Sequence, residues 1–144
     1  MRSGSAPVAR ILNHQDGLTS TAIVVAGDEQ SRVLFRGLLR LHHVWVDGEA
    51  EGETRAIELI RTHRPSLLVV DAILTDGSLT RLIGQARALV PGLRVILTVP
   101  APSSPHLSTN PSERPDVVLL RPFRMFQFAE AVAPPADSKR SSLL

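Results

Sequence analysis

The sequence predicts an α/β protein in which a five-stranded parallel sheet carries helices on both faces. Three observations support this fold class: short apolar runs recur along the chain, amphipathic segments separate them, and turn-forming residues stand at the junctions. Runs of about four to six apolar residues are typical of strands that are buried on both faces, as in parallel sheets. Alternation of such strands with helices predicts right-handed crossovers and a doubly wound (βα)5 sheet.

The composition is that of one ordinary globular domain. The chain has 144 residues, of which 43% are hydrophobic and 21% charged, and this is enough for one core. No apolar run approaches the roughly 18 residues of a membrane span, and the N-terminus does not resemble a signal peptide. Cysteine is absent from the sequence, which fits a cytoplasmic location. The formal net charge of +2 does not favour nucleic acid as a partner.

The domain boundaries follow from composition. Residues 1–20 are rich in Gly, Ser, Pro, Asn and Asp and are predicted to form a flexible tail. One short apolar patch in it, Val8 to Leu12, could dock on the domain, although a loose extension is favoured. Residues 21–133 form the predicted folded domain, and residues 134–144 form a second flexible tail.

The first strand is predicted at residues 21–26, and Gly27 ends it. Asp28 is the expected N-cap of a helix that continues to about residue 41. The pair His42-His43 is interpreted as the turn after this helix, because adjacent side chains do not share a face and cannot hold one metal ion. The apolar residues at helical spacing in the helix are Val33, Leu34, Leu38 and Leu41.

The middle of the chain repeats this pattern twice. A short strand at residues 44–46 precedes a turn predicted at residues 47–49, and residues 53–63 are predicted as a helix that ends before Pro65. The next strand, residues 67–71, is followed by a turn at Asp76-Gly77 and by a helix from Ser78, its N-cap, to about Leu89. The expected inward residues of the two helices are Ala56, Ile57 and Ile60, and Leu79, Leu82, Ile83 and Ala86.

The last third departs from this regular pattern. A strand at residues 94–99 precedes residues 100–115, which contain five prolines among serines and threonines. Each internal proline would cost a helix about 3 kcal/mol, so this segment is expected to be a loop with at most one helical turn. A strand at residues 116–120 and a helix at residues 123–132 complete the domain.

Asp71 is the most informative single residue, because it ends a strand that is apolar throughout. In open α/β sheets, functional sites lie at the carboxyl ends of the strands. The residues before and after it form an ordered set: Val24-Val25 at the end of the first strand; Arg32, Leu34, Phe35, Arg36, Leu38 and Leu39 in the first helix; Leu68-Val69-Val70-Asp71; and Arg121-Pro122-Phe123 after the last strand.

In this order the features resemble the receiver domain of bacterial two-component response regulators, over about residues 21–133. The resemblance implies a flavodoxin-like fold, a role in signal transduction rather than in catalysis, and the phospho-acceptor position for Asp71. Receivers neutralise the charge that develops during phosphoryl transfer with Mg²⁺, which carboxylates hold. The family supplies for this an acidic pair after strand one, a hydroxyl at the end of strand four and a lysine after strand five.

This sequence departs from the family at those places. The acidic pair falls on Ala26 and Gly27, and the lysine is Arg121. The hydroxyl position falls on Val99, whereas Thr98 is one residue earlier and is expected to point to the other face. The proline that is usual after the acceptor is Thr75.

Asp28 and Asp71 are then the candidate metal ligands, too few for a full Mg²⁺ site. The favoured hypothesis is an atypical receiver that needs no cofactor. An alternative is an active single-domain response regulator that takes phosphate on Asp71 with Mg²⁺. A third is a small flavodoxin-like enzyme or ligand-binding protein, which the single glycine in residues 26–29 does not favour.

The expected interaction surface comprises the fourth helical segment, the last strand and the last helix. Met125 and Phe126, with the adjacent Arg124, lie on a part of that helix that need not face the sheet. They either form an exposed interface or fill the space of the missing helix. The expected partner is another signalling protein or a second copy of the chain, rather than a membrane or a nucleic acid.

Overall fold

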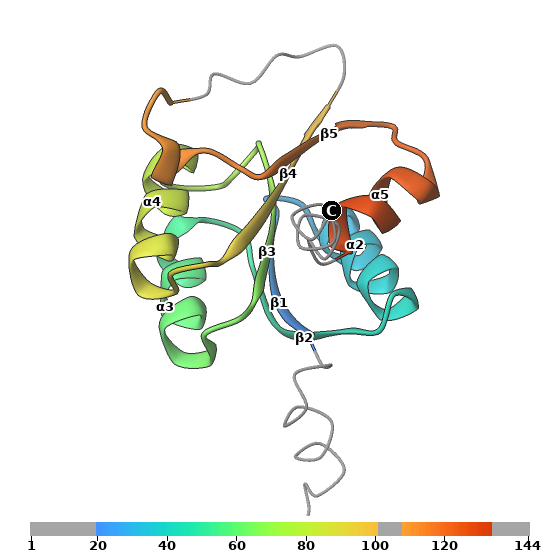
Figure 1. Cartoon of the computed structure of the whole chain (residues 1–144), viewed down its shortest axis with the longest axis horizontal. Helices are drawn as coiled ribbons and strands as arrows, with labels where there is room; N and C mark the ends of the chain where they lie inside the picture. Colours follow the sequence, from blue (N-terminus) through green and yellow to red (C-terminus); the bar gives the residue numbers. More distant parts are fainter. Residues whose placement is uncertain (1–19, 101–107, 134–144) are drawn as a thin grey trace, which may run out of the picture.

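Five parallel strands form one sheet in the order β2-β1-β3-β4-β5 (Figure 1). The computed structural model describes residues 20–100 and 108–133, so the two predicted tails and residues 101–107 lie outside the described residues. The strands are β1 (Ser20–Val25), β2 (Val44–Ala50), β3 (Leu67–Asp71), β4 (Arg94–Pro100) and β5 (Val117–Arg121). The helices are α2 (Glu29–Leu41), α3 (Glu53–His63), α4 (Leu79–Leu89) and α5 (Met125–Val132).

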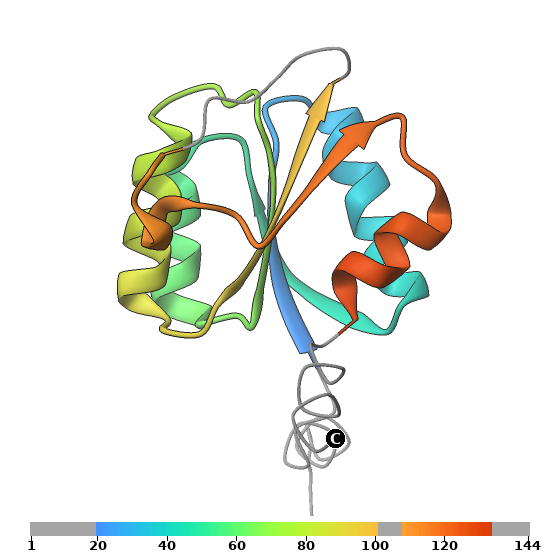
Figure 2. The same cartoon turned by 45° about the horizontal axis from the view of Figure 1, so that its top comes forward.

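The helices cover the sheet in two pairs, with α2 and α5 on one face and α3 and α4 on the other (Figure 2). Successive side chains of a strand point to opposite faces, so each strand contributes to two cores. Leu67 and Val69 of β3 pack in the α2/α5 core, and Leu68 and Val70 pack in the α3/α4 core. All four are buried, which confirms the predicted doubly wound parallel sheet.

The helix ends agree with the predicted caps. Asp28 is the N-cap of α2 and accepts a hydrogen bond from Ser31 N–H at 2.9 Å. Ser78 caps α4 and accepts from Arg81 N–H at 3.2 Å. His42 is the C-cap of α2, and its Nδ1 lies 2.8 Å from the Leu38 carbonyl oxygen. The interpretation of His42 as part of a terminal turn is therefore confirmed.

The predicted turn at residues 47–49 is wrong, because these residues belong to β2. The pairing of β1 with β2 shifts by one residue between Ala22 and Ile23, so that Gly48 and Glu49 continue the ladder. The irregularity absorbs one extra residue in β2. Glu49 also forms ion pairs with Arg32 and Arg36 of α2.

The four apolar residues at helical spacing in α2 do not all enter the core. Val33, Leu34 and Leu41 are 47%, 46% and 65% exposed. The residues that enter the core are Phe35, Leu38 and Leu39. The buried stripe is centred on Phe35, so side chains at the edges of the apolar stripe remain at the surface. In α3, Leu59 is buried and Ile57 is only partly buried.

The segment between β4 and β5 contains, in its described part, only a single 3-10 turn, η1 (Pro111–Glu113). This agrees with the prediction of a loop with at most one turn. β5 consequently has apolar side chains that no helix covers, with Val118 36% and Leu120 50% exposed. Within the described ranges, no helix is long and apolar enough to cross a membrane.

Candidate functional site

Three polar side chains meet at the carboxyl edge of the sheet, on the face that α2 and α5 cover. Asp71 ends β3, and Arg121 ends β5. Thr98 of β4 is the register partner of Asp71. Side chains of register partners in parallel strands point to the same face. Because the three strands end at one edge, a carboxylate, a hydroxyl and a guanidinium are brought together.

The Asp71 carboxylate is buried, with 1% of its side chain exposed, and it accepts hydrogen bonds from two residues and forms an ion pair with a third. The Thr98 hydroxyl donates to Oδ1 at 2.7 Å, and Ile73 N–H donates to Oδ2 at 3.2 Å. Arg121 Nη2 lies 2.9 Å from Oδ1. A buried carboxylate is tolerated only when its charge is compensated, and here the guanidinium provides that charge.

Arg121 also links this carboxylate to the start of α2. Its Nη1 donates to Ser31 Oγ at 3.1 Å, and the Ser31 hydroxyl donates to Asp28 Oδ1 at 2.8 Å. The backbone N–H of Ser31, followed by its hydroxyl, lowers the pKa of Asp28 against a smaller upward effect of burial. The charge of Arg121 adds a further small lowering of that pKa. The N-cap of α2 and the edge of the sheet therefore form one continuous polar network.

The expectation that Thr98 points away from Asp71 is wrong. Val99, where the family hydroxyl was placed, is 1% exposed and packs in the α3/α4 core. Adjacent residues of a strand point to opposite faces, so Thr98, and not Val99, shares the face of Asp71.

The two candidate metal ligands, Asp28 and Asp71, both accept hydrogen bonds from protein donors. Ala26 is buried, and a Cβ atom on Gly27 would lie 3.0 Å from the Ile73 carbonyl oxygen, so an acidic side chain there would require a shift. Among residues 20–100 and 108–133, no three His, Cys, Asp or Glu side chains are placed to hold a metal ion. One carboxylate beside a guanidinium is a donor set that does not fit Mg²⁺, which requires several oxygen ligands.

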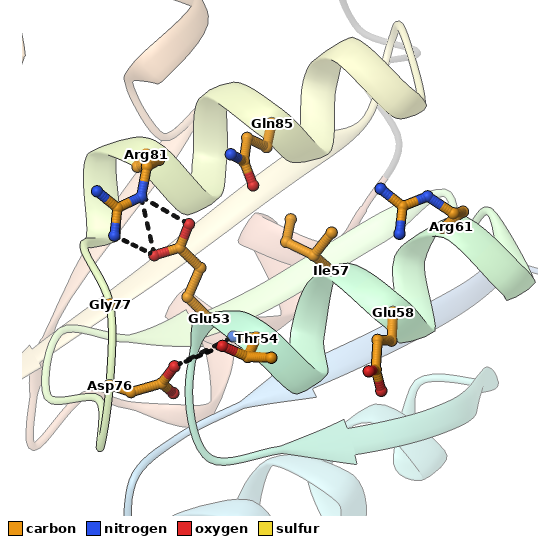
Figure 3. Close-up of a pocket in the computed structure, with 9 residues that line it drawn as sticks. All are labelled: Glu53, Thr54, Ile57, Glu58, Arg61, Asp76, Gly77, Arg81 and Gln85. Carbon is orange, nitrogen blue, oxygen red and sulfur yellow. Dashed lines mark hydrogen bonds and ion pairs between the residues drawn. The ribbon is translucent and has the colours of Figure 1, made fainter.

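A second carboxylate–arginine pair lies on the opposite face of the sheet, and the sequence alone did not predict it. Glu53 begins α3, and Arg81 lies in the first turn of α4 (Figure 3). Arg81 Nε lies 3.1 and 2.9 Å from the two carboxylate oxygens of Glu53, and Nη2 lies 2.9 Å from Oε1. The pair lines a pocket of about 460 Å³ between the two helices.

Glu53 also fixes the loop that follows Asp71. Its Oε1 accepts from Ser78 N–H at 2.9 Å, and its backbone N–H donates to the Asp76 carbonyl at 3.2 Å. The hydrogen bonds from Arg81 are the largest cause that lowers the pKa of Glu53, and burial opposes them. Gly77 has φ of +86°, and a Cβ atom there would lie 2.2 Å from Glu53 Oε1. The loop thus depends on both a glycine and a carboxylate.

The residues of the expected interface lie at the start of α5. Met125 and Phe126 are 52% and 59% exposed, so they do not fill the space of the missing helix as core residues. Arg124, the N-cap residue, is also exposed. Phe128, two positions after Phe126, is fully buried against the sheet, so Phe126 points to the outer side of the helix.

Met125 lies beside α2. Together with Leu34, Leu38 and Phe123 it lines a groove of about 440 Å³ between α2 and α5. Arg121 and the prolines at positions 100 and 122 complete the lining. We call this the α2/α5 groove. It joins the edge site, through Arg121, to the expected interface.

Three residues of these networks were not predicted from sequence. Ser31 stands three positions after the N-cap Asp28, which is the usual distance for a capping contact, so a local signal for it existed. Glu53 and Arg81 are 28 positions apart, and an acidic residue in the first turn of a helix is ordinary. No local pattern indicated that pair.

Comparison with known proteins supports the fold. The receiver domain of AraT, a response regulator from Geobacillus stearothermophilus, has a TM-score of 0.71 and 20% identity, and covers 87% of this chain and 98% of its own. A receiver domain protein from Clostridium thermocellum has a TM-score of 0.71 and 13% identity, and covers 87% of this chain and 99% of its own. A CheY-like receiver domain protein from Methanospirillum hungatei has a TM-score of 0.69 and 17% identity, with coverages of 86% and 98%.

Neither a model of a known protein family nor a curated protein matches the sequence. The structural matches span nearly all of the solved chains, so the similarity extends over a whole receiver domain. The chain therefore has the flavodoxin-like fold of response regulator receiver domains, as its sequence features implied.

Proposed function

We propose that this chain is an atypical receiver domain that acts in signal transduction through protein contacts, without Mg²⁺-dependent phosphorylation of Asp71. The observation that carries the proposal is the ion pair between the buried Asp71 carboxylate and Arg121, at 2.9 Å. The guanidinium takes the place next to the carboxylate that a metal ion would need.

The chemistry of phosphoryl transfer supports this interpretation. A carboxylate that attacks a phosphoryl group needs an accessible oxygen and a cation that stabilises the charge developing on the phosphoryl oxygens. In this chain Asp71 Oδ1 accepts from the Thr98 hydroxyl and is ion-paired with Arg121, and Oδ2 accepts from Ile73 N–H. Attack would require the ion pair between Asp71 and Arg121 to open. The planar guanidinium of Arg121 is also larger than the compact ammonium group of lysine.

The contacts through which the chain acts are proposed to lie at the start of α5. An exposed Met and Phe next to an exposed Arg have the composition of an interface core, where aromatic residues, Met and Arg are enriched. The partner is another signalling protein or a second copy, since symmetric dimers are the commonest assembly. Concentration-dependent sedimentation that Phe126→Glu abolishes would identify the second copy.

Intact mass spectrometry tests the proposal. The protein is incubated with acetyl phosphate and Mg²⁺, beside a phosphorylation-competent receiver as the control for the reagent. We expect the mass of this chain to remain unchanged while the control gains one phosphoryl group. A stoichiometric phosphoryl adduct that is absent from Asp71→Ala would overturn the proposal.

The second candidate is an active single-domain response regulator, and one specific observation favours it. The Thr98 hydroxyl lies 2.7 Å from Asp71, and the cation of Arg121 stands where the resembling family has lysine. Three of the family's functional groups therefore meet at the expected edge. The same experiment distinguishes the two candidates, because only the second one forms the adduct.

A further inference from the structure

We propose that the segment Val8–Leu12 of this same chain docks in the α2/α5 groove and covers it until a partner displaces it. This inference concerns the regulation of the proposed function and rests on it, because covering the groove matters only if the neighbouring surface binds a partner. The inference combines the chemistry of the groove, the chemistry of the segment and the length of chain between them.

The groove has a surface that an apolar segment would fit. Leu34 and Met125 on its walls are 46% and 52% exposed, while Leu38 is 7% exposed and Phe123 is partly buried. Apolar side chains from two helices therefore face one volume of about 440 Å³. Contiguous exposed apolar surface of this kind is typical of binding sites, and burying it is favourable by about 25 cal/mol per Å².

The segment has matching chemistry. Val8, Ile11 and Leu12 have the spacing i, i+3, i+4, so that one helical turn would place all three on one face. Arg10 would lie on the opposite face and remain in water. Elsewhere in residues 1–19 the apolar residues are single or small, so this segment is the part best suited to enter an apolar groove.

The connecting chain is long enough. Ser20 begins β1 at the amino edge of the sheet, whereas the groove lies near the carboxyl ends of β4 and β5. The six residues of β1 extend about 20 Å, and the seven residues 13–19 reach about 24 Å when extended. The reach exceeds the length of β1 by only a few ångströms, so residues 13–19 would be nearly extended when the segment is docked.

Two features of the composition permit a clean measurement. The chain has two methionines, Met1 and Met125, and it has no cysteine. In the full-length protein with 13C-labelled methionine methyl groups, Met125 reports on the groove. A nitroxide on Asn13→Cys is then the only spin label. We expect the Met125 methyl signal to lose most of its intensity when the label is paramagnetic and to recover it when the label is reduced.

Matched variants assign this effect. The pair Ile11→Asp and Leu12→Asp in the segment should restore the Met125 signal, and so should Leu34→Asp in the groove. Val33→Asp is the control for the groove, because Val33 lies in the same helix as Leu34, is 47% exposed and does not line the groove. This control should leave the broadening unchanged, as should Arg10→Ala in the segment.

Each other outcome overturns the proposal. An unaffected Met125 signal means that the segment does not occupy the groove. Broadening that is also seen when the nitroxide and the 13C label are on separate chains mixed together means that a second copy is the occupant. Intact mass measured on a chain that begins at Ser20 keeps the two proposals apart. If Asp71 stays unmodified there while Met125 is unaffected in the full chain, the docking fails and the proposed function stands.

Discussion

Two carboxylate–arginine pairs lie near the carboxyl edge of the sheet, one on each face, and they differ in how much water reaches them. In the edge site, the side chains of Asp71 and Arg121 are 1% and 25% exposed. In the helix pair, the side chains of Glu53 and Arg81 are 9% and 58% exposed. Both carboxylates are buried, but only the second has an arginine that is largely in water.

The local structure also stabilises the charge of Glu53 more than the charge of Asp71. Glu53 lies in the first turn of α3, where the helix dipole already favours a negative charge, and it accepts from Ser78 N–H. Asp71 ends a strand, so no helix dipole assists it, and among the described residues Arg121 is the one cation in an ion pair with it. The comparison indicates that Asp71 depends on its arginine for stability far more than Glu53 does.

The largest expected effect is the loss of stability when each arginine is removed. Arg121→Met should lower the free energy of unfolding by about 3–5 kcal/mol, because it leaves a buried carboxylate without a compensating charge. Arg81→Met should cost much less, because its ion pair is screened by water. Urea unfolding followed by far-UV circular dichroism measures both changes.

The control for this comparison is Asp71→Asn, which removes the charge and keeps the shape. Arg121 is partly exposed and can take up water, so Asp71→Asn should cost less than Arg121→Met. In the double variant the two losses should not add. Equal losses for Arg121→Met and Arg81→Met would show that burial does not distinguish the two pairs.

The residues of the site that could be predicted from sequence are those that a local pattern marks. Asp71 was found because a strand that is apolar throughout and ends in a carboxylate is unusual. The doubly wound sheet followed from the apolar runs, and the single 3-10 turn in the described part of the segment between β4 and β5 followed from the prolines. These are local patterns, and the sequence displays them directly.

The contacts that were missed depend on register or on distant residues. Thr98 was assigned to the wrong face because one residue decides where a strand side chain points. Glu53 and Arg81 come together only after two helices pack on the same face. The helical spacing of the apolar residues in α2 did not separate the exposed Leu34 from the buried Leu38, because an apolar stripe in one sequence does not show where the centre of the buried face lies.

A second prediction concerns the loop that Glu53 holds. Gly77→Ala should cost about 2–3 kcal/mol, because φ is +86° and the new Cβ would lie 2.2 Å from Glu53 Oε1. Gly92→Ala is the matched control, with φ of +89° and no atom within 4 Å of the new Cβ, and should cost about 1 kcal/mol. Urea midpoints of the two variants measure the difference, which isolates the contact with Glu53. Similar midpoints would mean that the loop yields without disturbing the helix pair.

The smallest expected effect is the dependence of stability on acid. The hydrogen bonds from Arg81 lower the pKa of Glu53 below its ordinary value of about 4.5, so the folded state holds that proton less readily than the unfolded state. The resulting stabilisation is complete above about pH 4.5 and is lost as the pH falls through the folded pKa. Glu53→Gln should therefore lose less stability than the wild type between about pH 6 and about pH 3, by less than about 1 kcal/mol because Arg81 is largely exposed.

Glu58→Gln, in an ion pair whose two side chains are 61% and 58% exposed, is the control and should follow the wild type. If the Glu53→Gln and wild-type urea midpoints fall in parallel with pH, the helix pair contributes nothing to stability through its charge.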